Sequence, residues 1–525
     1  MRRFPLVSGL AAFSMAGIMW SAPHTADAQL AQQAYVKAGN PQNQAQFGRA
    51  VAISGNTMVV GANQEGTGAA KSGAAYVFVR TGDTWTQQAF LKADNAQLND
   101  EFGISVAISG DTIVVGAWNE DGNDVDNSAY NSGAAYVFTR SGTTWTQQAY
   151  LKQTYPGQDD LFGVSVGISG ETIVVGARAE DSAAVGVNGD ESNDGRPRTG
   201  AAYVFTRSGT TWSQQAFLKA SNPDTNDYFG RVVAISGNTI VVGSYFENSN
   251  ATTVNGDGAN NSAENAGAAY VYFRTGTTWA QQAYLKANNA GAGDLYGSSV
   301  AVHGNTVVVG APGEASNATT VNGNAADNTA VGAGAAYVYL RTGTTWAHQA
   351  YLKASNAQAN DYFGDAVAVS LDGVAVGGWR EYSNATGIGG NQADNSQFFA
   401  GAVYLYSRTG TAWSQQAYVK ASNTNGGDEF AGNLAMSGGT LVVGAMKEAS
   451  NSPGVNGNQA NNSLGSAGAA YVFTGVPGAA AAPIRVTSVT KSGNNITILF
   501  SSATGLGGTG WVIEGSPHSR AGRMP

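Results

Sequence analysis

The chain has 525 residues, of which 71 are glycine and none is cysteine, and its formal net charge is −9. The absence of cysteine excludes a disulfide framework and thiolate chemistry, and the acidic balance argues against nucleic-acid binding, which requires a basic face. Length alone suggests three or four domains, but an internal repeat overrides that expectation.

Residues 1–28 have the pattern of a secretory signal peptide. Arg2 and Arg3 precede an apolar run over residues 5–20, and the small residues at 26–28 form a cleavage site before Gln29. We therefore expect export to the periplasm, the cell surface or the extracellular medium. An N-terminal membrane anchor is the alternative, but the apolar run is short for a bilayer span.

The repeating unit is clearest over residues 102–152. Residues 102–108 are small and apolar, and a Ser-Gly-Asp turn joins them to the β-branched run 112–116. Residues 133–139 and 145–151 read as two further strands. We name these four predicted antiparallel strands a, b, c and d in chain order.

The unit recurs along most of the chain. Its Phe-Gly anchor, or a variant of it, occurs at Phe47, Phe102, Phe162, Phe229, Tyr296, Phe363 and Phe430. A four-stranded sheet cannot bury both faces alone, so the copies must stack on one another. Seven such units predict an all-β protein with a seven-bladed β-propeller of four-stranded antiparallel blades.

The ends of the repeat predict how the ring closes. The Trp that opens strand d occurs six times, at Trp85, Trp145, Trp212, Trp279, Trp346 and Trp413, and the last unit ends after its strand c at residue 473. The missing strand lies at the other end, because residues 32–38 match residues 147–152. We therefore expect the propeller to span residues 29–475, with the N-terminal strand completing the last blade and leaving no open edge there.

Beyond the ring, residues 476–483 read as a small-residue linker. Residues 484–525 read as a short C-terminal β-rich segment, which is too short to hold a hydrophobic core alone.

The unit resembles the FG-GAP repeat, which forms the blades of integrin α-chain propellers and of many bacterial exported proteins. Phe102-Gly103 and Gly116-Ala117 match the two ends of that motif, and Gly310-Ala311-Pro312 matches its second end in full. The resemblance covers roughly residues 30–475. It implies the propeller fold, with a function among adhesion modules, ligand binders and appendages of enzymes.

Integrin-type blades often carry an Asp-x-Asp-x-Asp-Gly calcium loop in the a–b hairpin. Here that hairpin is as short as Ser109 to Thr112. It cannot supply several oxygen ligands to one ion, so the resemblance does not carry those calcium sites over.

Acidic residues recur elsewhere in the unit. A Glu follows the strand-b Gly by four residues in all seven units, at Glu65, Glu120, Glu180, Glu247, Glu314, Glu381 and Glu448. An Asp precedes the anchor by two residues in six units, at Asp100, Asp160, Asp227, Asp294, Asp361 and Asp428. Both positions fall on one face of the ring, together with loop acids that include Asp124, Asp126, Asp190, Asp194, Asp327 and Asp394.

Three interpretations of these carboxylates remain open. They cap backbone N–H groups and hold their own turns, they bind hard cations with calcium as the candidate ion, or they contact a ligand directly. The predicted metal ligands are Glu120, Asp124, Asp126, Asp160, Glu180, Asp190, Asp194, Asp227, Glu247, Asp294, Glu314, Asp361, Glu381, Asp428 and Glu448.

The recurrent Trp residues favour blade-to-blade packing, with stacking on sugar rings between blades as the alternative.

The sequence contains few residue patterns that are typical of catalytic sites. The four His do not recur, and no nucleophile signature accompanies them. A G-x-G-x-x-G match at residues 505–510 lacks a following helix and reads as a turn. No residue is predicted to be catalytic.

These observations favour an exported, monomeric, non-enzymatic module that binds an extracellular protein or polysaccharide. Calcium is the only candidate cofactor. We expect neither nucleic-acid binding nor a membrane span in the mature chain. The alternatives are a propeller lectin that binds glycans between its blades and a polysaccharide-active hydrolase.

Overall fold

The computed structural model describes residues 29–122, 128–477, 485–492, 495–501 and 512–513. The predicted signal peptide lies outside the described residues, and the predicted linker is described only at Val476 and Pro477. Within the described part of the chain, no helix has the length and hydropathy needed to cross a membrane.

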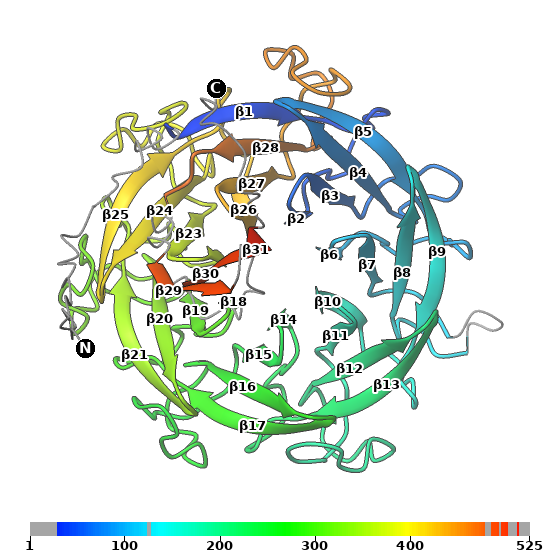
Figure 1. The fold of residues 1–525 in the computed structure, drawn as a ribbon, viewed down its shortest axis with the longest axis vertical. Helices are drawn as coiled ribbons and strands as arrows, with labels where there is room; N and C mark the ends of the chain where they lie inside the picture. Colours follow the sequence, from blue (N-terminus) through cyan, green and yellow to red (C-terminus); the bar gives the residue numbers. More distant parts are fainter. Residues whose placement is uncertain (1–28, 123–127, 478–484, 493–494, 502–511, 514–525) are drawn as a thin grey trace, which may run out of the picture.

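Seven four-stranded antiparallel sheets surround a central channel (Figure 1). In each blade, strand a is innermost and strand d is outermost. Blades 1 to 4 consist of β2 (Ala50–Ser54), β3 (Thr57–Ala62), β4 (Ala74–Thr81) and β5 (Thr84–Leu91); β6 (Ser105–Ser109), β7 (Thr112–Ala117), β8 (Ala134–Ser141) and β9 (Thr144–Leu151); β10 (Phe162–Ser169), β11 (Thr172–Ala177), β12 (Ala201–Ser208) and β13 (Thr211–Leu218); and β14 (Val232–Ser236), β15 (Thr239–Ser244), β16 (Ala268–Thr275) and β17 (Thr278–Leu285).

Blades 5 to 7 follow the same order, and blade 7 takes its outermost strand from the N-terminus. Their strands are β18 (Ser299–His303), β19 (Thr306–Ala311), β20 (Ala335–Thr342) and β21 (Thr345–Leu352); β22 (Ala366–Ser370), β23 (Gly373–Gly378), β24 (Ala402–Thr409) and β25 (Ala412–Val419); and β26 (Phe430–Ser437), β27 (Thr440–Ala445), β28 (Ala469–Thr474) and β1 (Ala31–Val36).

The ring closes as the repeat count predicts. β1 pairs antiparallel with β28, from Ala31 opposite Thr474 to Val36 opposite Ala470. On the other side of blade 7, the Ser437 hydroxyl accepts a hydrogen bond of 3.1 Å from the Gly55 amide of blade 1. The predicted seven-bladed propeller with an N-terminal closing strand is therefore confirmed.

Burial follows the radial position of each strand. All six residues of the strand-b segment β7 are buried, whereas the outermost strand β9 is mostly exposed or half-buried. Strands b and c are sandwiched between neighbouring blades, which explains why their sequences are continuously apolar rather than alternating. The face that carries the b–c and d–a loops is called the loop face below, and the a–b and c–d turns form the opposite face.

The sequence places the start of strand a at the Phe-Gly anchor, but in five blades the strand begins later, as β6 does at Ser105. Phe102 instead forms an isolated parallel bridge to Gly73 of the preceding blade. Gly103 adopts a positive φ of 92°, and a Cβ on it would collide with the Ala74 carbonyl oxygen. The anchor is thus a contact between blades, and its Gly is needed for a close backbone approach.

Each strand-d Trp is also held against the neighbouring blade. Trp279 is 3% exposed, and its Nε1 donates a 2.8 Å hydrogen bond to Gln215 in strand d of the preceding blade. The Arg274 guanidinium lies 5.1 Å from the indole centroid. Equivalent Trp–Gln bonds of 2.7–3.0 Å join Trp85 to Gln33, Trp145 to Gln88, Trp212 to Gln148, Trp346 to Gln282 and Trp413 to Gln349. These contacts favour blade packing over sugar stacking as the role of the Trp residues.

Blade 7 lacks this connection to blade 6. Leu30 stands where the other strands d carry Trp, and it packs beside the apolar core shared by blades 6 and 7. Gln416 of blade 6, the counterpart of Gln215, instead donates to Ser414 of its own strand.

After the ring, the backbone forms a three-stranded sheet from β29 (Arg485–Ser492), β30 (Asn495–Ser501) and β31 (Val512–Ile513). Before it, the Val476 amide donates a 3.1 Å hydrogen bond to Gly439 in the a–b turn of blade 7. The chain therefore leaves the ring at the face opposite the loop face.

Candidate functional site

Each recurring Glu on the loop face pairs with a Lys of the same blade. In blade 4, Lys286 Nζ lies 2.8 Å from Glu247 Oε2, and neither side chain is more than 1% exposed. The other pairs span 2.6–3.1 Å: Lys37 with Glu448, Lys92 with Glu65, Lys152 with Glu120, Lys219 with Glu180, Lys353 with Glu314 and Lys420 with Glu381. Each pair joins the end of strand d to the b–c loop.

The remaining oxygen of the Glu carboxylate is surrounded by donors. Glu247 Oε1 accepts hydrogen bonds from the Tyr284 hydroxyl at 2.7 Å and from Asn222 Nδ2 at 3.1 Å. The Glu247 backbone carbonyl accepts a 2.8 Å bond from the Gly267 amide at the start of the next strand. The residue thus fixes both ends of its loop.

The recurring Asp residues hold the d–a turns. Asp227 Oδ2 accepts a 2.8 Å hydrogen bond from the Asp224 amide. The same i−3 bond, at 2.6–3.1 Å, is made by Asp100, Asp160, Asp294, Asp361 and Asp428.

Burial disfavours the charged form of these Asp side chains. Burial, together with the charge of nearby Glu247, raises the pKa of Asp227 to about 8. The pKa is raised by burial to about 6 in Asp100 and to about 7 in Asp160, Asp294, Asp361 and Asp428.

The acids of the long loops are local turn formers where they are described. Asp190 accepts hydrogen bonds from the amide and hydroxyl of Ser192, at 3.0 and 2.6 Å. Asp327 and Asp394 make the same bonds to Thr329 and Ser396. Asp194 is exposed, and Asp124 and Asp126 lie outside the described residues.

The structure describes the surroundings of most of the predicted metal ligands. Calcium needs six to eight oxygen ligands, whereas the Glu carboxylates face ammonium, amide and hydroxyl donors. Among the described residues, no group of three or more His, Cys, Asp or Glu is placed to hold an ion. The geometry favours the turn-holding interpretation, and calcium binding stays a prediction.

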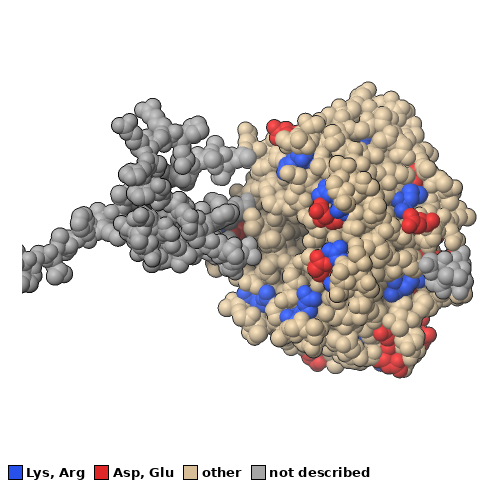
Figure 2. Space-filling view, turned by 45° about the vertical axis from the view of Figure 1, so that its right-hand side comes forward, with Lys and Arg blue, Asp and Glu red and all other residues tan. Residues whose placement is uncertain are grey.

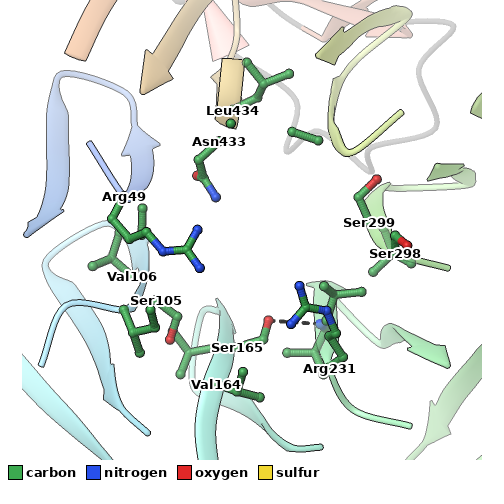
Figure 3. Close-up of a pocket in the computed structure, with 18 of the residues that line it drawn as sticks. Arg49, Ser105, Val106, Val164, Ser165, Arg231, Ser298, Ser299, Asn433 and Leu434 are labelled. Atoms are coloured by element: carbon green, nitrogen blue, oxygen red, sulfur yellow. Dashed lines mark hydrogen bonds between the residues drawn. The ribbon is translucent and has the colours of Figure 1, made fainter. Parts of the chain in front are cut away.

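The central channel offers a different kind of site. It encloses about 290 Å³ and is lined by strands a of all seven blades. The residue two positions after the anchor aromatic residue lines the channel and differs from blade to blade: Arg49, Ile104, Val164, Arg231, Ser298, Asp365 and Gly432. Figure 3 shows the Arg49 and Arg231 side chains extending into the open centre.

Aromatic and cationic side chains surround the channel on the loop face. Arg178 lies 5.3 Å from the Trp118 ring and 5.7 Å from the Tyr228 ring, and so bridges blades 2 and 4. Arg231 lies 5.0 Å from the Tyr245 ring. These contacts are cation–π interactions, with each guanidinium within about 6 Å of a ring centroid.

Blade 6 carries the densest part of this ring. Arg380 lies 4.3 Å from the Tyr362 ring, 4.4 Å from the Trp379 ring and 5.1 Å from the Phe399 ring. Tyr382 packs against Phe399 at 5.7 Å. We call the half-buried residues Trp118, Arg178, Tyr228, Tyr245, Tyr362, Trp379, Arg380, Tyr382 and Phe399 the mouth residues.

The mouth residues were not predicted from the sequence, because the prediction rested on residues that recur in every repeat. Trp118, Arg178, Tyr245 and Trp379 occupy one position, two residues after the strand-b Gly, and it is Asn63, Pro312 and Met446 in the other blades. The signal that reveals them is variation at a fixed position between copies that otherwise agree.

Comparison with known proteins agrees with the repeat count. No curated protein matches the chain. The FG-GAP repeat model matches seven segments, at residues 30–78, 85–138, 145–205, 212–272, 279–339, 346–406 and 413–473, which together cover well over half of the chain. Each segment begins in strand d of one blade and ends in strand c of the next, so the first segment includes the closing strand. The chain belongs to the FG-GAP repeat family.

Proposed function

We propose that the protein is an exported, non-enzymatic binding module that engages an extracellular protein or polysaccharide through the loop face of its ring. One observation supports this most. All seven blades share the Glu–Lys pair and six of them share the Trp–Gln bond, whereas the mouth residues differ from blade to blade. Ring stability requires the framework, but it does not require a particular Trp or Arg at the mouth of one blade.

The state of the carboxylates supports a binding role over hydrolysis. Glycoside hydrolysis needs one acid and one base in distinct environments. The recurring Glu and Asp side chains are instead engaged by lysines and backbone amides in the same way in successive blades. The lectin alternative, with sugars stacked on the strand-d Trp residues, is disfavoured because those indoles bond across the blade interfaces.

Export is proposed from the signal-like pattern of residues 1–28 and from the family, many of whose members are exported. Expression in a bacterial host followed by mass spectrometry of the secreted or periplasmic protein tests it. We expect a mature N-terminus at Gln29. Retention of the full chain in the cytoplasm would argue against export.

Binding by the loop face is tested with substitutions on opposite faces of the ring. Purified wild type is screened against arrays of polysaccharides and extracellular matrix proteins, and every positive is repeated with Trp379→Ala, Tyr382→Ala and Leu371→Ala. Leu371 is 45% exposed in an a–b turn and serves as the control for the opposite face. We expect the two mouth variants to bind at least tenfold more weakly and Leu371→Ala to bind normally. Loss with Leu371→Ala alone, or turnover of a bound polysaccharide, would contradict the proposal.

A further inference from the structure

Three charged side chains line the central channel: Arg49 of blade 1, Arg231 of blade 4 and Asp365 of blade 6. Arg49 and Arg231 reach the open centre from blades that are three apart (Figure 3). Charged groups that line a closed channel are costly unless they are paired or serve a ligand. These three charges therefore need either counter-charges nearby or a ligand.

The arginines at the ends of strands c are held by hydrogen bonds or ion pairs. At the end of strand c, Arg274 donates hydrogen bonds to Asn238 and Thr172, and Arg140 forms an ion pair with Asp111. Figure 2 shows the same balance on the outer surface, where basic and acidic side chains lie side by side. None of Arg49, Arg178, Arg231 and Arg380 has a carboxylate oxygen within 4.0 Å among the described residues.

The acids near the mouth are engaged by other groups. Glu101 accepts hydrogen bonds from Asn63, Gln64 and Trp118 at 2.7–2.9 Å. Glu429 Oε1 pairs with Lys447 at 2.6 Å, and its Oε2 is buried without a hydrogen-bond partner in the described structure. Asp365 is the acidic residue that lines the channel itself, and it forms no ion pair with Arg49 or Arg231 among the described residues.

The guanidinium groups also act on one another. Burial lowers the pKa of Arg49 and of Arg178, and in both cases the charge of Arg231 lowers it further. The Nε atoms of Arg178 and Arg380 are buried and have no hydrogen-bond partner in the described structure. Arg178 and Arg380 are not among the residues that line the channel, whereas Arg49 and Arg231 are. An anion in the channel would relieve the repulsion between Arg49 and Arg231, since arginine presents a fork of donors that matches a carboxylate.

The surroundings of the cationic centre suit a sugar. At about 290 Å³, the cavity lies at the small end of ligand sites, which span roughly 300–1,000 Å³. The mouth residues supply aromatic faces that can pack against the apolar faces of sugar rings, and Ser298 supplies a hydroxyl. The size matches one sugar residue in the channel, with its neighbours lying over the mouth.

We propose that the central channel binds a carboxylate-bearing sugar residue of an acidic polysaccharide, with Arg49 and Arg231 contacting the carboxylate. This assignment rests on the proposed function and names the chemistry of its ligand. It predicts binding that weakens with salt, because the contacts are between charges. It also predicts that Asp365 opposes binding, because its charge has the same sign as the ligand.

The test measures binding of tetragalacturonate to the mature full-length chain by calorimetry and by tryptophan fluorescence, to which Trp118 and Trp379 at the mouth contribute. Two further probes separate the chemical components: the methyl ester of tetragalacturonate keeps the sugar and removes the charge, and a tetraglutamate peptide keeps the charge and removes the sugar. We expect tetragalacturonate to bind at least tenfold more tightly than either. Equal binding of the ester would overturn the carboxylate contact, and tighter binding of the peptide would overturn the polysaccharide assignment.

Substitutions of the channel residues test whether the ligand binds in the channel. Arg49→Gln with Arg231→Gln should weaken tetragalacturonate binding at least tenfold, whereas Arg198→Gln, which removes the same charge from an exposed b–c loop position, should leave it unchanged. Asp365→Asn should tighten binding several-fold. Each variant is first matched to the wild type by its melting temperature, which shows whether the loss of the Arg231–Tyr245 contact affects the fold. Loss of binding with Asp365→Asn would overturn the model of an anion site.

Failure of this assignment can be separated from failure of the proposed function. If tetragalacturonate does not bind, the anion site is overturned. Array positives that depend on Trp379 and Tyr382 would still support the loop face as a binding surface for another ligand.

Discussion

Lys37 Nζ and Glu448 Oε2 lie 2.8 Å apart although 411 positions separate them in the chain, and both side chains are fully buried. Lys37 directly follows β1, and its ion pair with Glu448 connects this strand to the b–c loop of the last blade. The closure of the ring therefore includes a buried charge as well as the backbone ladder between β1 and β28.

Replacement of Lys37 by Met should destabilise the ring by about 3–5 kcal/mol, because it leaves the Glu448 carboxylate buried without its counter-ion. Equilibrium denaturation in urea measures this. The double variant Lys37→Met with Glu448→Gln should recover most of the loss, since no uncompensated charge remains and Gln can still accept from Asn423.

Lys286→Met is the matched control for closure. It breaks the same pair in blade 4, where strand d follows strand c through a tight turn. We expect a similar loss of stability, but only Lys37→Met should make β1 sensitive to proteolysis under native conditions. Equal sensitivity of the two variants would contradict a special role for the Lys37 pair in closure.

The buried Asp residues predict that stability falls as pH rises through neutrality. Their pKa values in the folded chain, about 7 in Asp294 and about 8 in Asp227, exceed the ordinary value of 3.8. The folded state therefore binds more protons between these values, and the stabilisation present below pH 3.8 is lost as pH rises through 7 to 8. Melting temperature should be higher at pH 6 than at pH 8.5.

Asp227→Asn isolates this contribution, because an amide oxygen can still accept from the Asp224 amide and carries no charge. The variant should be more stable than the wild type at pH 8.5, and the difference should shrink toward pH 5. A difference that grows on acidification would show that the charged form is the one favoured by the fold.

The Glu–Lys pairs predict a melt that does not depend on calcium. A ligand that binds only the folded state raises the melting temperature by mass action, so a calcium-stabilised ring would melt earlier in EDTA. Because Lys286 and its counterparts already neutralise the buried Glu carboxylates, we expect identical calorimetric melts with calcium and with EDTA. A reproducible drop in EDTA would restore the calcium interpretation, with the loop at residues 119–126 as its first candidate.

A substitution at the interface between blades 6 and 7 should increase the stability of the ring. Leu30→Trp introduces the residue that the other strands d carry, and an indole donor to Gln416 would add about 1 kcal/mol. Urea denaturation measures the gain, and the same substitution in a Gln416→Ala background should lose most of it. No gain in either background would mean that the Leu30 environment cannot accept the indole.

The architecture could be predicted because it rests on repetition. Seven anchors and six Trp residues require one missing strand, and residues 32–38 supply it, so the pairing of β1 with β28 followed from counting. The start of strand a could not be placed correctly, because Phe102 and Gly103 look like strand residues but act in a bridge to the preceding blade.

The chemistry of the site was less accessible from sequence. The recurring Glu residues were recognised, but their partners were missed, although Lys152 and its counterparts recur at an equally fixed spacing. Whether a carboxylate faces an ammonium group or an ion depends on how strand d lies beside the b–c loop, which is a three-dimensional relationship. The mouth residues were missed for the opposite reason, because Trp118, Arg178 and Trp379 do not recur.

The pairing of β1 with β28 also has a consequence for biogenesis. During N-to-C synthesis or transport, the strand that finishes the last blade emerges first, and its partner at residues 469–474 emerges after the rest of the ring. Until then its backbone donors and acceptors have no native neighbour, so the strand can pair with other copies of the chain unless it is kept from doing so. A nascent chain halted before residue 469 would hold six of its sheets and would still be unable to close.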